Sequence, residues 1–257
     1  PTRAAHAQGV RLAEEFIRRY LQDHGDWPSG VIVDLWGSAT MRTAGEEFAM
    51  ALHLLGVRPV WTEGTERVSG FEILPLPLLD RPRIDVTLRV SGLFRDVFPS
   101  LSGLYQQAVE ALAERPETPD WNPYMASSET ARIYGPAPGS YGLGMGAAAE
   151  QFSDAGRQAA ADAWLEASSY ALNAEGSFQD KQGIQNRVAQ ADSVIHLQDL
   201  PETDLLRSAD YAAHEAGFAA AKASVGGQAA LYHIDNTNPN TPAARSLSEE
   251  IARVVYA

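Results

Sequence analysis

The sequence predicts an α/β fold in which a mostly parallel sheet is flanked by helices. Nearly continuous apolar runs at 31–37 (VIVDLWG) and 84–90 (IDVTLRV) are typical of strands that are buried on both faces. Segments with helical apolar spacing separate such runs, so strand, helix and strand alternate as in a βαβ unit. With 257 residues, 45% of them hydrophobic, the chain can bury a sizeable core.

The first part of the chain supplies the first βαβ pattern. A helix that Ser38 or Thr40 caps and Gly56 closes is predicted to join the strand at 31–37 to a second parallel strand at 57–62, VRPVWT. The other elements predicted here are two helices and a third strand, at 11–21, 99–114 and 84–90.

The middle of the chain is rich in Pro and Gly. The run 132–144, RIYGPAPGSYGLG, is predicted to be a shaped loop, neither a helix nor a central strand. We therefore expect the sheet to be divided into two α/β lobes, 1–115 and 146–257, with 116–145 as linker and loop.

The last part of the chain repeats the rhythm of the first. The predicted elements are helices at 154–170 and 184–188, a strand at 192–196, a helix that Ser208 or Asp204 caps and that runs to Lys222, a strand at 230–235 and a terminal helix opened by Ser246 or Ser248. Because the chain begins without Met and stops inside that helix, we expect it to be a piece of a longer polypeptide.

Composition excludes several classes of function. The net charge of −13 argues against nucleic-acid binding, which needs clusters of Lys and Arg. The absence of Cys excludes disulfides, thiolate metal ligands and a Cys nucleophile. No apolar run reaches the ~20 residues of a membrane span, and the N-terminus lacks a signal peptide's apolar core. No phosphate-binding fingerprint is present, so this segment is not expected to bind a nucleotide.

The stretch 192–218 is the densest in chemistry. A short strand runs into His196, Gln198 and Asp199, and a predicted helix then carries Asp210, His214 and Glu215, with His214 four residues after Asp210 and so on the same helical face. His233 and Asp235 end the last strand in the same way. If the two strands are neighbours, both clusters open on one edge of the sheet. The alternative is a solvated loop and an ordinary acidic helix start.

Two further features bear on ligands. Arg89 and Arg95 lie near the end of the third strand and could meet a carboxylate-bearing ligand, although a surface ion pair is the alternative. Glycines beside Tyr134 and Tyr141 would let a flat ligand approach the backbone closely. No Ser-His-Asp arrangement and no H-E-x-x-H motif stands out, so hydrolysis, metal delivery and a purely structural role all stay open on the residues alone.

Four long segments carry a resemblance to a known family: HLQDLPETDLLRSADYAAHEAGFAAA, RIYGPAPGSYG, RPRIDVTLRVSGLFRD and YHIDNTNPNTPAARSLSEEIARVV. Taken in their order along the chain, they resemble the C-terminal part of the large subunit of aerobic cobaltochelatase (CobN), which is related to the H subunit of magnesium chelatase. The family's Gly-rich segment of the kind Y-x-W/Y-G-x-G-x-x-G is kept only in part here, at 170–176.

The resemblance implies insertion of Co²⁺, as substrate, into hydrogenobyrinic acid a,c-diamide during cobalamin synthesis in the cytoplasm. It also implies that ATP is hydrolysed by a separate AAA+ motor subunit, with an adaptor subunit as a further partner. The chemistry of insertion then favours His196, His214 and Glu215 for proton transfer, with Asp210 orienting His214. Other expected roles are tetrapyrrole binding by Arg132, Tyr134, Tyr141 and Asp199, and metal contact by His214, Glu215 and His233. A scaffold without a site of its own, or a paralogue for another metal or tetrapyrrole, is the alternative.

Overall fold

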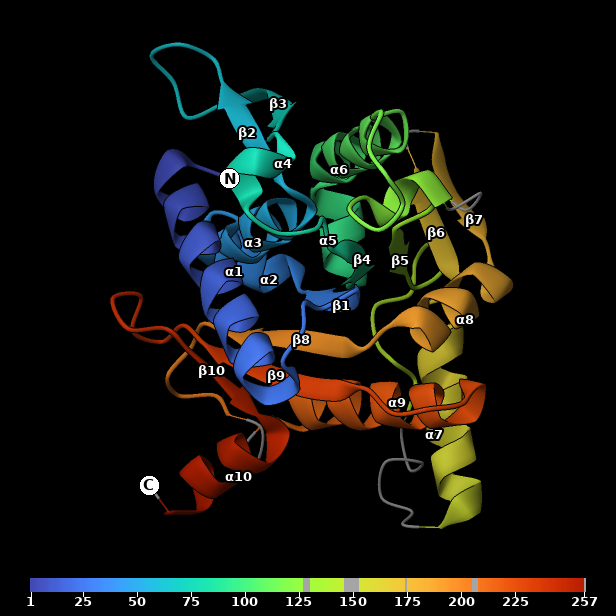
Figure 1. Cartoon of the computed structure of the whole chain (residues 1–257). Helices are drawn as coiled ribbons and strands as arrows, with labels where there is room; N and C mark the ends of the chain where they lie inside the picture. The colour runs from blue at the N-terminus through green and yellow to red at the C-terminus, as the bar shows by residue number, and fades with distance from the viewer. Residues whose placement is uncertain (127–129, 146–152, 174, 205–207, 257) are drawn as a thin grey trace.

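In the computed structural model of the chain, the predicted α/β architecture is confirmed (Figure 1). The structure describes residues 1–126, 130–145, 153–173, 175–204 and 208–256. They form a mixed eight-stranded sheet in the order β10-β9-β8-β1-β4-β5-β6-β7. Its strands are β1 (Gly30–Leu35), β4 (Asp85–Val90), β5 (Ile133–Gly135), β6 (Tyr170–Asn173), β7 (Gly176–Gln179), β8 (Ser193–Gln198), β9 (Ala230–Asp235) and β10 (Ala243–Ser246).

The centre of the sheet is parallel, because β9, β8, β1, β4 and β5 all run in one direction. The outer strands β10, β6 and β7 pair antiparallel with their neighbours. One sheet thus takes strands from both expected lobes, with β1 hydrogen-bonded between β4 and β8. The sheet itself is continuous across residues 116–145. The division of the chain into two lobes at these residues stays a prediction.

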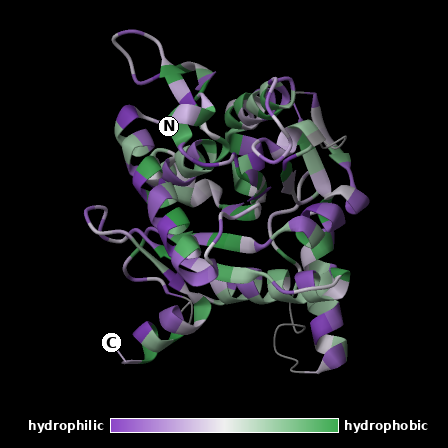
Figure 2. Cartoon of the chain, viewed as in Figure 1, coloured by the Kyte–Doolittle hydropathy of each residue, from purple (hydrophilic) through white to green (hydrophobic). Residues whose placement is uncertain are grey.

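Helices cover both faces of the sheet. One face packs against α1 (Arg3–His24), α3 (Glu46–Leu55) and α6 (Pro99–Ala113), and the other against α7 (Asp154–Glu166), α8 (Lys181–Gln190) and α9 (Ala209–Val225). Figure 1 shows α7 and α9 below β8 and β9, and α3 and α6 above β1. The remaining helices are α2 (Gly37–Thr43), α4 (Leu76–Leu79), α5 (Gly92–Val97), α10 (Leu247–Tyr256) and the 3₁₀ turn η1 (Pro123–Ala126). In Figure 2 the central strands are mainly apolar. Among the described residues, no helix is long and apolar enough to cross a membrane.

The prediction that residues 57–62 form a parallel strand of the main sheet is wrong. Residues Val57–Trp61 do form a strand, β2, but it pairs antiparallel with β3 (Val68–Ile73) in a separate two-stranded sheet. Its Arg58 and Val60 are exposed, and Pro59 lacks the N–H that a central strand needs. The next strand along the chain that pairs in parallel with β1 is therefore β4.

Two smaller expectations are also corrected. The helix predicted after Ser38 or Thr40 is two helices, α2 and α3, separated by Ala44 and Gly45, which both adopt positive φ. Part of the expected loop at 132–144 is a strand, since β5 lies between β4 and β6. Of the incomplete Gly-rich segment at 170–176, residues 170–173 form β6 and Gly176 begins β7, its antiparallel partner.

α9 lies very close to α7 because Gly217 faces Trp164. A Cβ atom at Gly217 would lie only 2.8 Å from Cδ1 of Trp164, nearer than real Cβ contacts. Ser208 caps α9 as predicted, its hydroxyl accepting a hydrogen bond from the Tyr211 amide at 3.3 Å. The position of α9 over the sheet is thus fixed by a cap and by a glycine contact.

Lys222 of α9 is expected to contribute about 2 kcal/mol to stability. Its buried ammonium donates to the carbonyls of Val188, Ala189 and Ala191 at 3.1, 2.7 and 2.7 Å, at the C-terminal end of α8. Lys222→Met keeps the apolar stem but leaves these buried carbonyls without their donor, which costs roughly 1–3 kcal/mol. Urea unfolding measures the change. The control Lys181→Met removes an exposed ion pair with Glu166 and should cost less than about 1 kcal/mol. Equal losses in both variants would contradict the prediction.

Candidate active site

A row of polar side chains crosses the sheet near the carboxyl ends of four parallel strands. In the strand register, Arg89 of β4 pairs with Asp34 of β1, Asp34 with His196 of β8, and His196 with His233 of β9. Their neighbours along each strand belong to the core on the opposite face, so all four side chains lie on the face that α9 covers. The strands that carry His196 and His233 are neighbours, so the condition for a shared site at one edge of the sheet is met.

α9 lies over this row and adds two more polar side chains to it. Tyr211, His214, Glu215 and Phe218 recur at helical spacing and face inward. Nδ1 of His214 lies 3.0 Å from Asp34 Oδ2, and Glu215 Oε1 lies 3.2 Å from His233 Nδ1. The structure therefore brings His196, His214, Glu215 and His233 together at one edge of the sheet.

Asp34 is the residue that the sequence reasoning missed. Its carboxylate is 9% exposed and lies in the middle of the row. Trp36 Nε1 donates to Oδ2 at 2.6 Å, and Arg89 Nη1 is 3.6 Å from Oδ1. Burial would raise the pKa of Asp34, but His214, His196 and Arg89 outweigh burial and hold that pKa well below its usual value. The carboxylate is ionised.

His214 lies between the buried row and solvent, with a side chain that is 14% exposed. Burial lowers its pKa below 6.5; Asp34 opposes this, and the positive charge of Arg89 adds to it. The imidazole is therefore neutral at pH 7. A neutral imidazole is a proton acceptor suited to chemistry near neutral pH.

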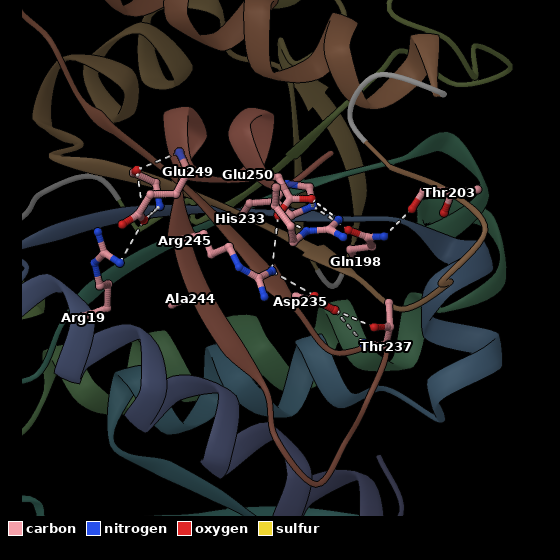
Figure 3. Close-up of polar contacts among 12 residues, drawn as sticks. Arg19, Gln198, Thr203, His233, Asp235, Thr237, Ala244, Arg245, Glu249 and Glu250 are labelled. Atoms are coloured by element: carbon pink, nitrogen blue, oxygen red, sulfur yellow. Dashed lines mark hydrogen bonds and ion pairs between the residues drawn. The ribbon is translucent and has the colours of Figure 1, made fainter. Parts of the chain in front are cut away.

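A second group of polar residues lies around His233, among them Gln198 and Glu250 (Figure 3). Nε2 of His233 lies 3.0 Å from Gln198 Oε1 and 3.9 Å from Glu250 Oε1, while Nδ1 faces Glu215. Glu250 is fully buried at the start of α10 and is paired with Arg245 and Arg253. Both nitrogens of His233 are thus engaged with protein oxygens.

Several buried atoms at the site lack a hydrogen-bond partner. Among the described residues these include Asp34 Oδ1, both ring nitrogens of His196 and Glu215 Oε2. These three residues border a cavity of about 20 Å³ under α9, together with apolar side chains such as Ile32 and Phe218. This volume suits a water molecule rather than a macrocycle. Within the described ranges, no group of three or more His, Asp or Glu side chains is arranged to hold a metal ion.

A larger groove of about 790 Å³ opens beside His214. This is within the ~300–1,000 Å³ typical of ligand pockets. One wall is a run of small side chains on α9, and the other is the loop segment 141–145. Its lining comprises Trp36, Arg89, Ser91, Tyr141, Gly142, Leu143, Gly144, Met145, Ala209, Asp210, Ala212, Ala213, His214 and Ala216.

Arg95 holds the loop that forms this wall in place through hydrogen bonds. Its Nη1 donates to the carbonyls of Pro136 and Ala137 at 2.9 and 2.6 Å, and its guanidinium lies 5.6 Å from the centre of the Tyr141 ring. Tyr141 donates in turn to Asp96. Arg89, by contrast, is buried in the site and is not part of a surface ion pair.

Three of the residues expected to bind the tetrapyrrole have partners away from the groove. Arg132 is fully buried against Asp85 at the start of β4, and Tyr134 donates to Asp180 at 2.8 Å. Asp199 accepts two hydrogen bonds from Arg42, at 2.7 and 3.0 Å. Asp210, expected to orient His214, is exposed on the groove, and the carboxylate that contacts Nδ1 of His214 is Asp34. Of the expected tetrapyrrole contacts, Tyr141 lines the groove.

Comparison with known proteins identifies the family. The family model described as CobN/Magnesium Chelatase matches residues 1–257. The chain belongs to this family. It is 40% identical over its full length to the aerobic cobaltochelatase subunit CobN of Sinorhizobium sp and 41% identical to that of Pseudomonas aeruginosa. The chain spans 22% of the length of each of these relatives.

More distant members and a solved structure agree with this assignment. The magnesium-chelatase subunit ChlH of Oryza sativa subsp. japonica is 27% identical over 98% of the chain and is matched over 19% of its own length. The catalytic subunit of cobaltochelatase from Mycobacterium tuberculosis superposes with a TM-score of 0.92 at 33% identity, over 99% of this chain and 23% of that one. The fold described above is thus that of a segment of a CobN-type subunit.

Proposed function

We propose that this chain is the part of an ATP-dependent cobaltochelatase large subunit at which Co²⁺ enters hydrogenobyrinic acid a,c-diamide, in cobalamin biosynthesis in the cytoplasm. The observation that carries the proposal is a neutral, partly buried histidine, His214, at the side of a groove of ligand size. An AAA+ motor subunit and an adaptor subunit would be the partners, with ATP hydrolysed by the motor.

The groove offers what metal insertion requires of a protein. The macrocycle has to be held, and the proton on its inner nitrogens has to be removed as the ion enters. The small side chains of α9, among them Ala212 and Ala213, line the groove together with Tyr141 and Leu143, and their size leaves room for a planar ring. Arg89 provides a positive charge at the back of the groove for peripheral carboxylates.

His214 is the proposed proton acceptor. Its neutral ring can take a proton from a ring nitrogen, and the electron pair left on that nitrogen then binds the Co²⁺ substrate. Brief contact of the ion with His214 and Glu215 is part of the proposal, because Glu215 Oε2 lacks a hydrogen-bond partner. His233 is the weaker candidate for metal contact, since both of its nitrogens already face protein oxygens.

Filling the groove tests the proposal. Ala212→Trp places an indole on the exposed wall of α9, and the intact subunit is titrated with hydrogenobyrinic acid a,c-diamide while its absorbance shift is followed. We expect at least about tenfold weaker binding, equivalent to about 1.4 kcal/mol. Ala219→Trp is the matched control, because Ala219 is also exposed on α9 but does not line the groove.

Other outcomes separate the alternatives. Unchanged binding by Ala212→Trp would show that the ligand residues lie elsewhere in the subunit and that this segment is a scaffold. Normal tetrapyrrole binding with insertion of Mg²⁺ or Ni²⁺ in place of Co²⁺ would indicate a paralogous chelatase.

A further inference from the structure

Asp34 is an unusual residue for its position. The other residues of β1 from Val31 to Leu35 are apolar and buried, and a carboxylate among them loses most of its hydration. Burial of a charge is costly unless partners compensate for it. The identity of those partners therefore indicates what the carboxylate does.

Two ring N–H groups converge on one oxygen of Asp34. Trp36 Nε1, which is always a donor, lies 2.6 Å from Oδ2, and His214 Nδ1 lies 3.0 Å from the same atom. An ionised carboxylate can only accept hydrogen bonds. Nδ1 of His214 must therefore carry a proton, and in the neutral ring Nε2 must then be without one.

Other contacts do not reverse this assignment. Arg89 Nη1 lies 3.4 Å from Nδ1 of His214, and a hydrogen bond from it would require an unprotonated Nδ1. That distance is longer than the 3.0 Å to Asp34, so the carboxylate determines the tautomer. His196 Nδ1, at 3.6 Å from Oδ2, is beyond hydrogen-bond reach and does not compete.

We propose that Asp34 is a positioning residue that holds His214 as its Nδ1–H tautomer and so leaves the Nε2 lone pair for the ligand in the groove. The inference rests on the proposed function. In the reaction, an N–H bond of the macrocycle breaks, its electron pair stays on the ring nitrogen, and a new N–H bond forms at Nε2. Asp34 keeps its charge throughout and faces the imidazolium that results.

Two substitutions of similar size separate the acceptor from the charge. Asp34→Leu removes the acceptor and leaves Arg89 as the group facing Nδ1, so His214 should change to the Nε2–H tautomer. Asp34→Asn keeps an oxygen at the Oδ2 position, because Trp36 donates there, and should preserve the tautomer while the negative charge is lost.

The tautomer is read by solid-state NMR of the intact subunit labelled with ¹⁵N-histidine, and the signal of His214 is assigned by subtracting the spectrum of His214→Gln. In the assembled enzyme, Asp34→Leu should lower kcat for cobalt insertion about 100-fold and Asp34→Asn about tenfold, with KM for the tetrapyrrole within about twofold. A loss confined to kcat is not expected of a residue that merely supports the fold.

An Nε2–H signal from His214 in the wild-type subunit would overturn the proposal, whether or not Asp34→Leu folds. An Nδ1–H signal that persists in Asp34→Leu would overturn it as well. Full kcat in His214→Gln would instead remove the proposed function and leave the tautomer result standing, so the two failures are distinguishable.

Discussion

Replacing His214 with Gln in the assembled enzyme is expected to lower kcat for cobalt insertion by about 10²–10⁴-fold, the usual contribution of a positioned general base. Gln keeps a polar side chain of similar length but cannot accept a proton at neutral pH. KM for the tetrapyrrole should change little, because the walls of the groove stay in place. Steady-state kinetics with the motor and adaptor present measure both constants.

The pH dependence provides a second view of the same residue. The pKa of His214 lies below 6.5, so its imidazole is neutral at pH 7 and can accept a proton. It becomes protonated, and can no longer act as a base, as the pH falls through that lowered pKa. In the wild type, kcat should therefore decline on the acid side, below about pH 6.5. His214→Gln should lack this limb. His53→Gln, which alters a histidine that contacts Glu14 outside the site, should keep it. Equal kcat in wild type and His214→Gln would refute the assigned role.

Asp85→Asn is expected to lower the free energy of unfolding by about 3–5 kcal/mol, the cost of breaking a buried ion pair from one side. Asp85 Oδ1 lies 2.6 Å from Arg132 Nε, and Oδ2 lies 2.9 Å from Arg187 Nη1. Both guanidiniums are almost completely buried, and neutral Asn would leave two like charges close together. Urea unfolding followed by circular dichroism measures the loss.

The matched control for Asp85→Asn is Glu72→Gln, which breaks the exposed pair with Arg58 on the β2–β3 hairpin. Surface pairs contribute about 0–1 kcal/mol. A loss of less than about 1 kcal/mol in Asp85→Asn would show that the arginines are stabilised by other contacts.

Four of the five parallel strands were predictable because each is a short apolar run that the sequence delimits clearly, whereas β5 lies in the run that was predicted to be a loop. The runs at 31–37, 84–90, 192–196 and 230–235 correspond to β1, β4, β8 and β9. The run at 57–62 was correctly predicted to be a strand, but its pairing was predicted wrongly. The pairing depends on Pro59 and on the partner strand β3, which was not predicted from the sequence. Which strands lie side by side is decided by tertiary packing.

The site was predictable in its histidines but not in its carboxylate. His196 and His233 follow apolar residues at strand ends, and His214 and Glu215 share a helix with an evident cap. Asp34 looked like one polar position in a buried strand. Only the register, which pairs it with both Arg89 and His196, shows that it lies between a buried guanidinium and a histidine ring.

The contact between Gly217 and Trp164 sets the distance between α9 and α7, and so determines how closely His214 approaches Asp34. Any side chain at Gly217 would push α9 outward from α7, and the imidazole three residues earlier would be lifted off Asp34 with it. The alignment of the base is therefore held by an indole that does not touch it. In mechanical terms, α7 is the stop against which the helix carrying the base rests, and the packing of α9 against α7 sets the reach of that base.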